Sequence, residues 1–119
     1  MVRYLFREPK YPLLIETDGR VVSAWDNQRI DLLYEQSFFA KNNSYVVIDS
    51  TGEGWSFVPE YNVLSPLTTL KQWNKPKIID FFNTSLERVG LEERYQPGSL
   101  SNKRLKQVIL EIVEFESML

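Results

Sequence analysis

The chain has 119 residues, of which 43% are hydrophobic and 25% charged, and its formal net charge at pH 7 is −2. This length and composition are typical of a single globular domain over residues 1–119 and exclude an intrinsically disordered chain. The sequence contains no histidine and no cysteine, so the chain cannot form disulfides. It also lacks the side chains most often used to bind transition metals or to attack substrates near neutral pH.

Turn chemistry predicts two β-hairpins in the first half of the chain. An Asp-Gly step favours the positive φ angles of a tight hairpin turn, and a loop with two glycines suits a longer turn or a bulge. Residues 3–7 are a candidate edge strand. The first hairpin is predicted to pair residues 11–16 with 20–25, and the second to pair residues 45–49 with 55–58.

Apolar residues at helical spacing, together with capping residues, predict the helices. Asp26 and Asn74 are N-cap candidates, and Gly90 is a stop signal. The expected helical segments are, in chain order, a helix from Asp26 to about Asn42, a short turn from Ser65-Pro66, a helix over residues 75–89 and a helix over residues 102–118, with an exposed loop over residues 92–101.

This order of elements, with strands first and helices last, predicts an α+β fold: a small antiparallel sheet of two hairpins with helices packed on one side. No run approaches the ~20 apolar residues that a membrane span needs. Charged residues also lie among the first ten positions, where a signal peptide needs an apolar stretch. We therefore expect a cytoplasmic protein with no membrane partner.

Charge is distributed unevenly along the chain. Residues 11–60 hold eight acidic and three basic side chains, which gives −5, whereas residues 61–106 hold eight basic and four acidic side chains, which gives +4. Folding can bring the two blocks together and produce a mixed surface; alternatively, the acidic block forms a face that attracts a basic partner. Direct binding of nucleic acid needs the opposite balance and is not expected.

The last predicted helix carries its charges in an unfavourable order, because each of them opposes the helix dipole. Either burial of its apolar face outweighs these small terms, or its basic end meets an acidic neighbour or an anion. The basic residues of the first turns and the acidic residues of the last turns are Lys103, Arg104 and Lys106, and Glu111, Glu114 and Glu116.

Residues suited to catalysis are sparse. Asp49 and Glu53 flank one hairpin loop and form a candidate carboxylate pair, but acidic residues in such loops commonly serve solubility. The loop that contains Gly52 and Gly54 lacks the Lys-Ser/Thr ending of a phosphate-binding loop, and it leads into a predicted strand instead of a helix. We therefore expect no enzymatic activity, no metal site and no cofactor.

Trp55 is a candidate binding anchor, because it directly follows this polar loop and tryptophan is enriched at interface hot spots. The alternative is that Trp55 packs in the core or on the sheet. With the acidic residues of the first half of the chain, it completes the predicted partner-binding set: Asp26, Asp31, Glu35, Asp49, Glu53 and Trp55.

Three segments resemble small bacterial immunity proteins of contact-dependent growth inhibition systems. They are Tyr-Pro-Leu-Leu-Ile-Glu-Thr-Asp-Gly at 11–19, Val-Ser-Ala-Trp-Asp at 22–26, and Val-Ile-Asp-Ser-Thr-Gly-Glu-Gly-Trp-Ser-Phe at 47–57. The resemblance implies a cytoplasmic protein without catalysis of its own, which binds and blocks the C-terminal toxin domain of an effector delivered by a sibling cell. Such toxins are often nucleases. No individual binding residue follows from the resemblance.

Two hypotheses of different classes therefore stand. The first is a toxin-neutralising immunity protein, whose partner is a cognate protein toxin. The alternative is a small-molecule or carbohydrate-binding domain with an aromatic pocket. Genomic context distinguishes them, because an immunity gene is expected directly after a large effector gene. The oligomeric state is left open.

Overall fold

A computed structural model describes residues 1–67, 72–88 and 104–117. The loop expected at 92–101 and the stop signal at Gly90 lie outside the described residues. The elements are, in chain order, β1 (Arg3–Tyr4), β2 (Leu13–Glu16), β3 (Val21–Ala24), α1 (Asn27–Glu35), β4 (Tyr45–Ile48), β5 (Gly54–Val58), the 3-10 helix η1 (Pro59–Tyr61), β6 (Val63–Pro66), α2 (Lys75–Arg88) and α3 (Leu105–Ser117). The predicted α+β class is confirmed.

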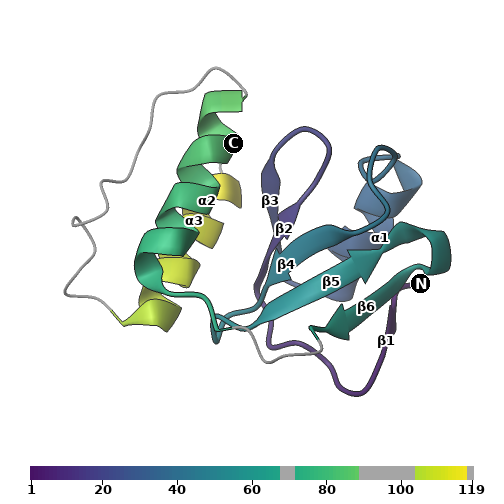
Figure 1. Ribbon diagram of the computed structural model, residues 1–119, viewed down its shortest axis with the longest axis horizontal. Helices are drawn as coiled ribbons and strands as arrows, with labels where there is room; N and C mark the ends of the chain where they lie inside the picture. The colour runs from purple at the N-terminus through teal and green to yellow at the C-terminus, as the bar shows by residue number, and fades with distance from the viewer. Residues whose placement is uncertain (68–71, 89–103, 118–119) are drawn as a thin grey trace.

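The six strands form one mostly antiparallel sheet in the order β1-β6-β5-β4-β2-β3 (Figure 1). Both predicted hairpins are present: β2 pairs with β3, and β4 pairs with β5. An antiparallel pairing of β2 with β4 joins the two hairpins. β1 pairs in parallel with β6 at one edge, which confirms an edge strand within residues 3–7.

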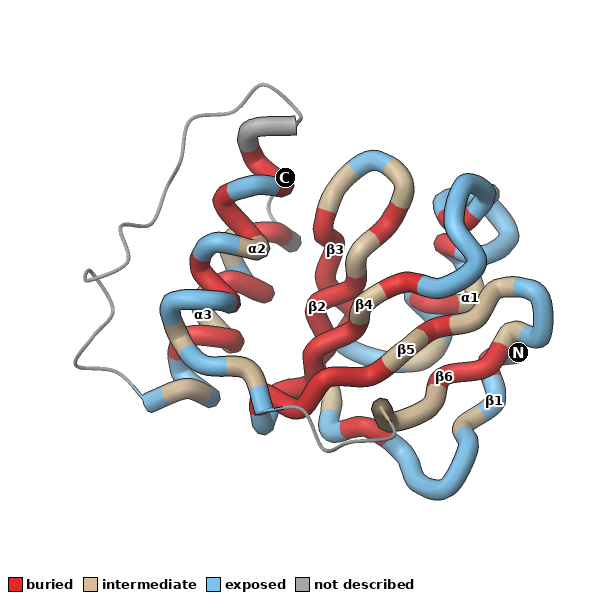
Figure 2. The backbone as a smooth tube through the Cα atoms, viewed as in Figure 1, coloured by how far each residue is buried: buried red, intermediate tan, exposed pale blue. Residues whose placement is uncertain are grey.

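Each face of the sheet has its own apolar cluster, because successive strand residues point to opposite faces. Leu13 and Ile15 of β2 pack with Ile30 and Leu33 of α1. Leu14, between them, points the other way and packs with apolar residues of α2 and α3. Figure 2 shows the buried positions concentrated in the strands and on one side of each helix.

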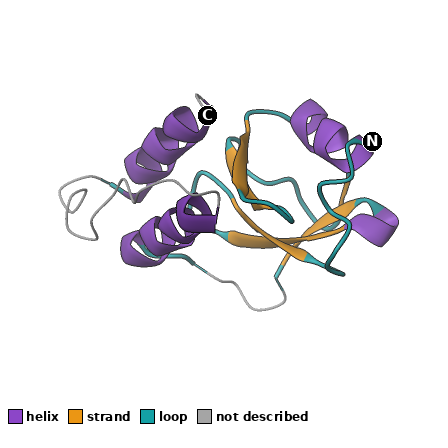
Figure 3. Cartoon of the chain, turned by 90° about the horizontal axis from the view of Figure 1, so that it is seen from above, coloured by secondary structure: helices purple, strands orange, loops and turns teal. Residues whose placement is uncertain are grey.

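The expectation that the helices pack on one side of the sheet is therefore wrong. The first strand of the first hairpin is buried on both faces, so one helical layer cannot cover it. α1 covers one face, whereas α2 and α3 cover part of the other, and the strands lie between them (Figure 3). None of the described helices is long and apolar enough to cross a membrane.

Local capping chemistry sets the start of two helices as predicted. Asp26 is the N-cap of α1, and its Oδ1 accepts a hydrogen bond from the Arg29 N–H at 3.2 Å. Asn74 precedes α2, and its Oδ1 accepts from the Lys77 N–H at 3.0 Å. These contacts satisfy backbone donors that the first turn of a helix leaves without partners.

Two other boundaries differ from the prediction. α1 ends at Glu35 instead of near Asn42, because Ser37 adopts a positive φ of 64° and turns the chain back toward the sheet. The Ser65-Pro66 segment is the end of β6 and not a helical turn, because Ser65 pairs with Ser56 of β5. Strand pairing therefore overrides the local preference of a Ser-Pro step for a helix start.

Two helix side chains cover the outer edge of β3, where N–H groups would otherwise lack partners. The Val21 N–H donates to Ser85 Oγ of α2 at 2.6 Å, and the Ser23 N–H donates to Glu116 Oε2 of α3 at 2.7 Å. The Ser23 hydroxyl also donates to Glu116, and the Arg20 guanidinium lies 3.7 Å from Glu116 Oε1. This contact explains why an acidic residue occupies the last turn of α3, against the helix dipole.

We expect Glu116→Ala to destabilise the protein, because the substitution leaves the buried N–H of Ser23 without an acceptor. One such donor costs about 1–3 kcal/mol. Urea unfolding measures the change, with Lys106→Ala, at an exposed position of the same helix, as the control. Equal unfolding free energies for the two variants would contradict this role of Glu116.

Candidate functional site

The six predicted site residues fall into two separate groups. Asp49, Glu53 and Trp55 are buried, with exposed fractions of 1%, 7% and 1%. Asp26 and Glu35 are exposed at the two ends of α1, and Asp31 is half-buried between them. The structure therefore does not unite the six residues in one surface.

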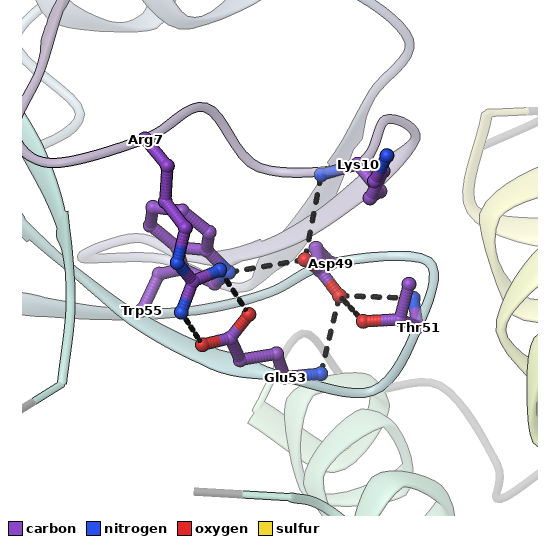
Figure 4. A network of polar contacts seen from close by, with 6 residues as sticks. All are labelled: Arg7, Lys10, Asp49, Thr51, Glu53 and Trp55. Atoms are coloured by element: carbon purple, nitrogen blue, oxygen red, sulfur yellow. Dashed lines mark hydrogen bonds and ion pairs between the residues drawn. The ribbon is translucent and has the colours of Figure 1, made fainter. Parts of the chain in front are cut away.

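The Asp49 carboxylate holds the loop between β4 and β5 from inside (Figure 4). Its Oδ1 accepts hydrogen bonds from the Thr51 N–H at 2.9 Å, from the Thr51 hydroxyl at 2.5 Å and from the Glu53 N–H at 3.1 Å. Its Oδ2 accepts from Trp55 Nε1 at 3.1 Å and from the Lys10 N–H at 3.4 Å. The donors surrounding this buried carboxylate compensate for its charge.

Arg7 closes this network from the outside. Its guanidinium donates to both carboxylate oxygens of Glu53 and lies 5.0 Å from the centre of the Trp55 ring. The hydrogen bonds with Glu53 raise the pKa of Arg7. Figure 4 shows Arg7 lying over Trp55.

The structure therefore gives Asp49, Glu53 and Trp55 an internal role. Trp55 packs in the core, which was the alternative to an interface anchor, and its indole N–H is already bonded to Asp49. A partner cannot reach these side chains without opening the loop. We therefore leave all three out of the candidate surface.

The loop glycines are also explained by packing. Gly52 has a φ of 87°, and a Cβ atom at this position would lie 2.4 Å from Leu105 Cδ2 of α3. The Trp73 N–H donates to the Gly52 carbonyl at 2.8 Å. The loop therefore packs against α3 and is hydrogen-bonded to the residues that precede α2.

The exposed side of α1 carries the candidate site. Trp25, directly before the N-cap, is 51% exposed, and Leu32 is 48% exposed. Glu35 follows Leu32 by three residues and is its neighbour on the helix surface. A hollow of about 440 Å³ is lined by Trp25 and Leu32 together with Arg20, Ser23, Asp26, Gln28, Arg29 and Glu116. The α1 surface is defined here as Trp25, Asp26, Gln28, Arg29, Leu32 and Glu35.

Two of the acidic residues of α1 have structural contacts as well. Asp26 caps the helix, and Asp31 Oδ1 accepts a hydrogen bond from the Val2 N–H at 2.8 Å, with the Met1 amino group 3.9 Å away. Glu35 forms no ion pair within the described residues. Its charge is therefore available to a partner in solution.

The structure buries Trp55, the tryptophan offered by the sequence as a binding anchor, and exposes Trp25. Trp25 was placed at the end of a hairpin strand, whereas β3 ends at Ala24 and the chain leaves the sheet at Trp25. The signal was present in the sequence, because Trp25 directly precedes the capping residue Asp26. A side chain at a strand-to-helix junction follows neither the alternation of the strand nor the periodicity of the helix.

Asp18 fixes the chain that follows α1. Its carboxylate accepts hydrogen bonds from the Ala40 N–H at 2.7 Å, from the Lys41 N–H at 3.2 Å and from the Tyr45 hydroxyl. Burial acts to raise the pKa of Asp18, but these hydrogen bonds outweigh burial and lower it below the ordinary value. Burial and the contact with Asp18 raise the pKa of Tyr45.

The alternative hypothesis of an aromatic pocket directs attention to Trp73. Two hollows, of about 300 Å³ and 310 Å³, share Trp73 and Lys77 in their linings. Phe81 lies beside this tryptophan, with 5.3 Å between the ring centres. Both volumes are at the lower limit of sites that enclose a small molecule, which is about 300 Å³.

Within residues 1–67, 72–88 and 104–117, no group of three acidic side chains is placed to hold a metal ion.

We expect the stabilising effect of Asp18 to depend on pH. A carboxylate with a lowered pKa in the folded state stabilises the protein above its unfolded pKa of about 3.9, and this contribution is lost as the pH falls through the folded pKa. Asp18→Asn should therefore be less stable than wild type at pH 7, and the difference should shrink toward pH 3. Urea unfolding at both values measures it, and a difference independent of pH would contradict the assignment.

Comparison with protein-family models, curated proteins and solved structures finds no match to this chain. The relation to immunity proteins of contact-dependent growth inhibition therefore stays a prediction.

Proposed function

We propose that this protein is a cytoplasmic immunity protein that binds a cognate toxin domain through the α1 surface and blocks its activity. The observation that carries the proposal is that an exposed tryptophan directly before α1 and an exposed leucine on α1 line the same hollow, while the opposite side of the helix is buried in the core. In this mechanism, the protein acts by covering its partner and carries out no reaction itself.

The apolar part of the α1 surface is suited to a protein interface. Tryptophan is among the residues most enriched at hot spots, where its large ring is removed from water. Trp25 and Leu32 line the same hollow, so a side chain of the partner can contact both. Ile30 and Leu33 hold the helix from the other side, and a rigid helix presents the two residues without further ordering.

The charged part of the α1 surface suits a partner with a basic face. Asp26 and Glu35 lie at opposite ends of the helix, with Arg29 between them. Charges at the rim of an interface act mainly on the rate of association, because they steer the partner before contact. Nuclease toxins fit this description, since proteins that bind nucleic acid carry basic surfaces.

The first test uses the purified C-terminal domain of the effector encoded directly upstream. We expect wild-type protein to bind this domain and Trp25→Ala to raise the Kd about 30-fold or more, which corresponds to about 2 kcal/mol for a hot-spot residue. The loss should lie mainly in the dissociation rate, measured by surface plasmon resonance. Tyr61→Ala, which removes another exposed aromatic ring, is the matched control. Absence of binding by the wild type would contradict the proposed function.

The second test separates steering from packing. Glu35→Lys should slow association and weaken its dependence on salt, because the exposed carboxylate forms no ion pair with the part of the chain that the structure describes. Asp26 and Asp31 are less suitable, since their replacement also removes a helix cap or a tie to Val2. Asp80→Lys on α2, which packs on the opposite face of the sheet, is the matched control. Equal association rates for both lysine variants would contradict an acidic binding face.

A further inference from the structure

The connection between β1 and β2 contains a strained turn. The Arg7 N–H donates to the Leu5 carbonyl at 2.8 Å, which closes a three-residue turn with Phe6 at its centre. The φ of Phe6 is 70°. A γ-turn with a positive φ at its central residue is rare and strained, and a bulky residue in this region is an outlier.

Contacts on both sides hold this turn in place. On one side, the Leu5 N–H donates to the Leu64 carbonyl of β6 at 3.1 Å. On the other side, Arg7 is fixed by Glu53 and by the ring of Trp55. Because both neighbours of Phe6 are bound to the fold, its backbone has little freedom to relax.

The turn directs Phe6 away from the protein. Phe6 is 93% exposed, the highest value among the large hydrophobic residues that the structure describes, and Leu5 beside it is 46% exposed. Folding gains nothing from a phenyl ring left in water, and glycine would adopt the same φ with no steric cost. Strain and exposure together therefore indicate a role outside the fold, because strained residues cluster at functional sites.

The α1 surface alone is too small for a tight complex. α1 has nine residues and is therefore about 14 Å long. A standard interface buries about 800 Å² on each partner. Contacts beyond one short helix are therefore needed.

Phe6 lies close along the chain to a contact with α1. Val2 is bonded to Asp31 of α1, and Phe6 follows Val2 by four residues. Strand geometry places Phe6 no more than about 13 Å along the chain from this contact. A single protein domain spans this distance.

We propose that Phe6 is a second anchor for the toxin domain and inserts its ring into an apolar pocket on that domain. This inference rests on the proposed function. Arg7 is paired with Glu53, so the exposed charges around the turn that have no ion pair within the described residues are Arg3 and Lys10 against Glu8. The pocket that takes the ring is therefore bordered by carboxylates, while a basic face of the same domain meets Glu35.

The test combines the stability of the free protein with its affinity for the toxin domain. Phe6→Gly should raise the melting temperature, because glycine relieves the positive φ, and should raise the Kd at least tenfold, because the ring is lost. Phe6→Tyr keeps the ring and should bind within threefold of wild type. Tyr61→Ala is again the control for loss of an exposed ring, and calorimetry measures both quantities.

The outcomes separate this inference from the proposed function. Wild-type affinity of Phe6→Gly for the toxin domain would overturn the anchor and leave the proposed function standing. Failure of the wild type to bind would overturn the proposed function, and the inference with it. A lower melting temperature for Phe6→Gly would identify the ring as a structural element and overturn the inference. A wild-type dimer that Phe6→Gly dissociates would do the same, because a second copy would then be the occupant.

Discussion

The buried carboxylate of Glu116 joins the last helix to the outer strand of the sheet, and the geometry around the α1 surface depends on this contact. An edge strand with open N–H groups invites pairing with another chain. Glu116 and Ser85 occupy two of those groups on β3, which ends at Ala24, and the chain leaves the sheet at Trp25. The same carboxylate lines the hollow beneath Trp25 and Leu32. A residue that we expect to stabilise the fold thus lies beside the proposed interface.

A second carboxylate, Asp49, has a corresponding role directly after the central strand β4. It ties the loop between β4 and β5 to the Lys10 backbone and thereby to the connection that carries Phe6. Arg7 completes the link through Glu53. The acidic residues of the loop are therefore used within the fold, which reduces the acidic block of the sequence to fewer charges on the surface.

The sequence was informative where a structure is set by neighbours in the chain. The first hairpin and the caps at Asp26 and Asn74 are set by local chemistry, and they were predicted correctly. The positive φ angles expected of the Asp-Gly step are absent, because neither Asp18 nor Gly19 adopts one. The environment of Trp55 was not predictable in this way, because Arg7 lies 46 residues from its partner Glu53. The placement of helices on two faces also depends on long-range packing, since apolar runs buried on both sides show no alternation that reveals how many layers cover them. Phe6 was not among the predicted site residues, because no local sequence pattern indicates a positive φ at a residue such as phenylalanine.

Both proposed anchors share one physical design. Trp25 stands at the end of an edge strand fixed by Glu116, and Phe6 stands in a turn fixed by Arg7 and Glu53. Each exposed ring is thus attached to backbone that is already ordered, so binding loses little conformational freedom and more of the burial energy appears as affinity. The cost falls on the free protein, which keeps two large apolar rings in water and one bulky residue at a positive φ. Selection for stability alone would remove both features, so the arrangement favours a protein selected for tight binding.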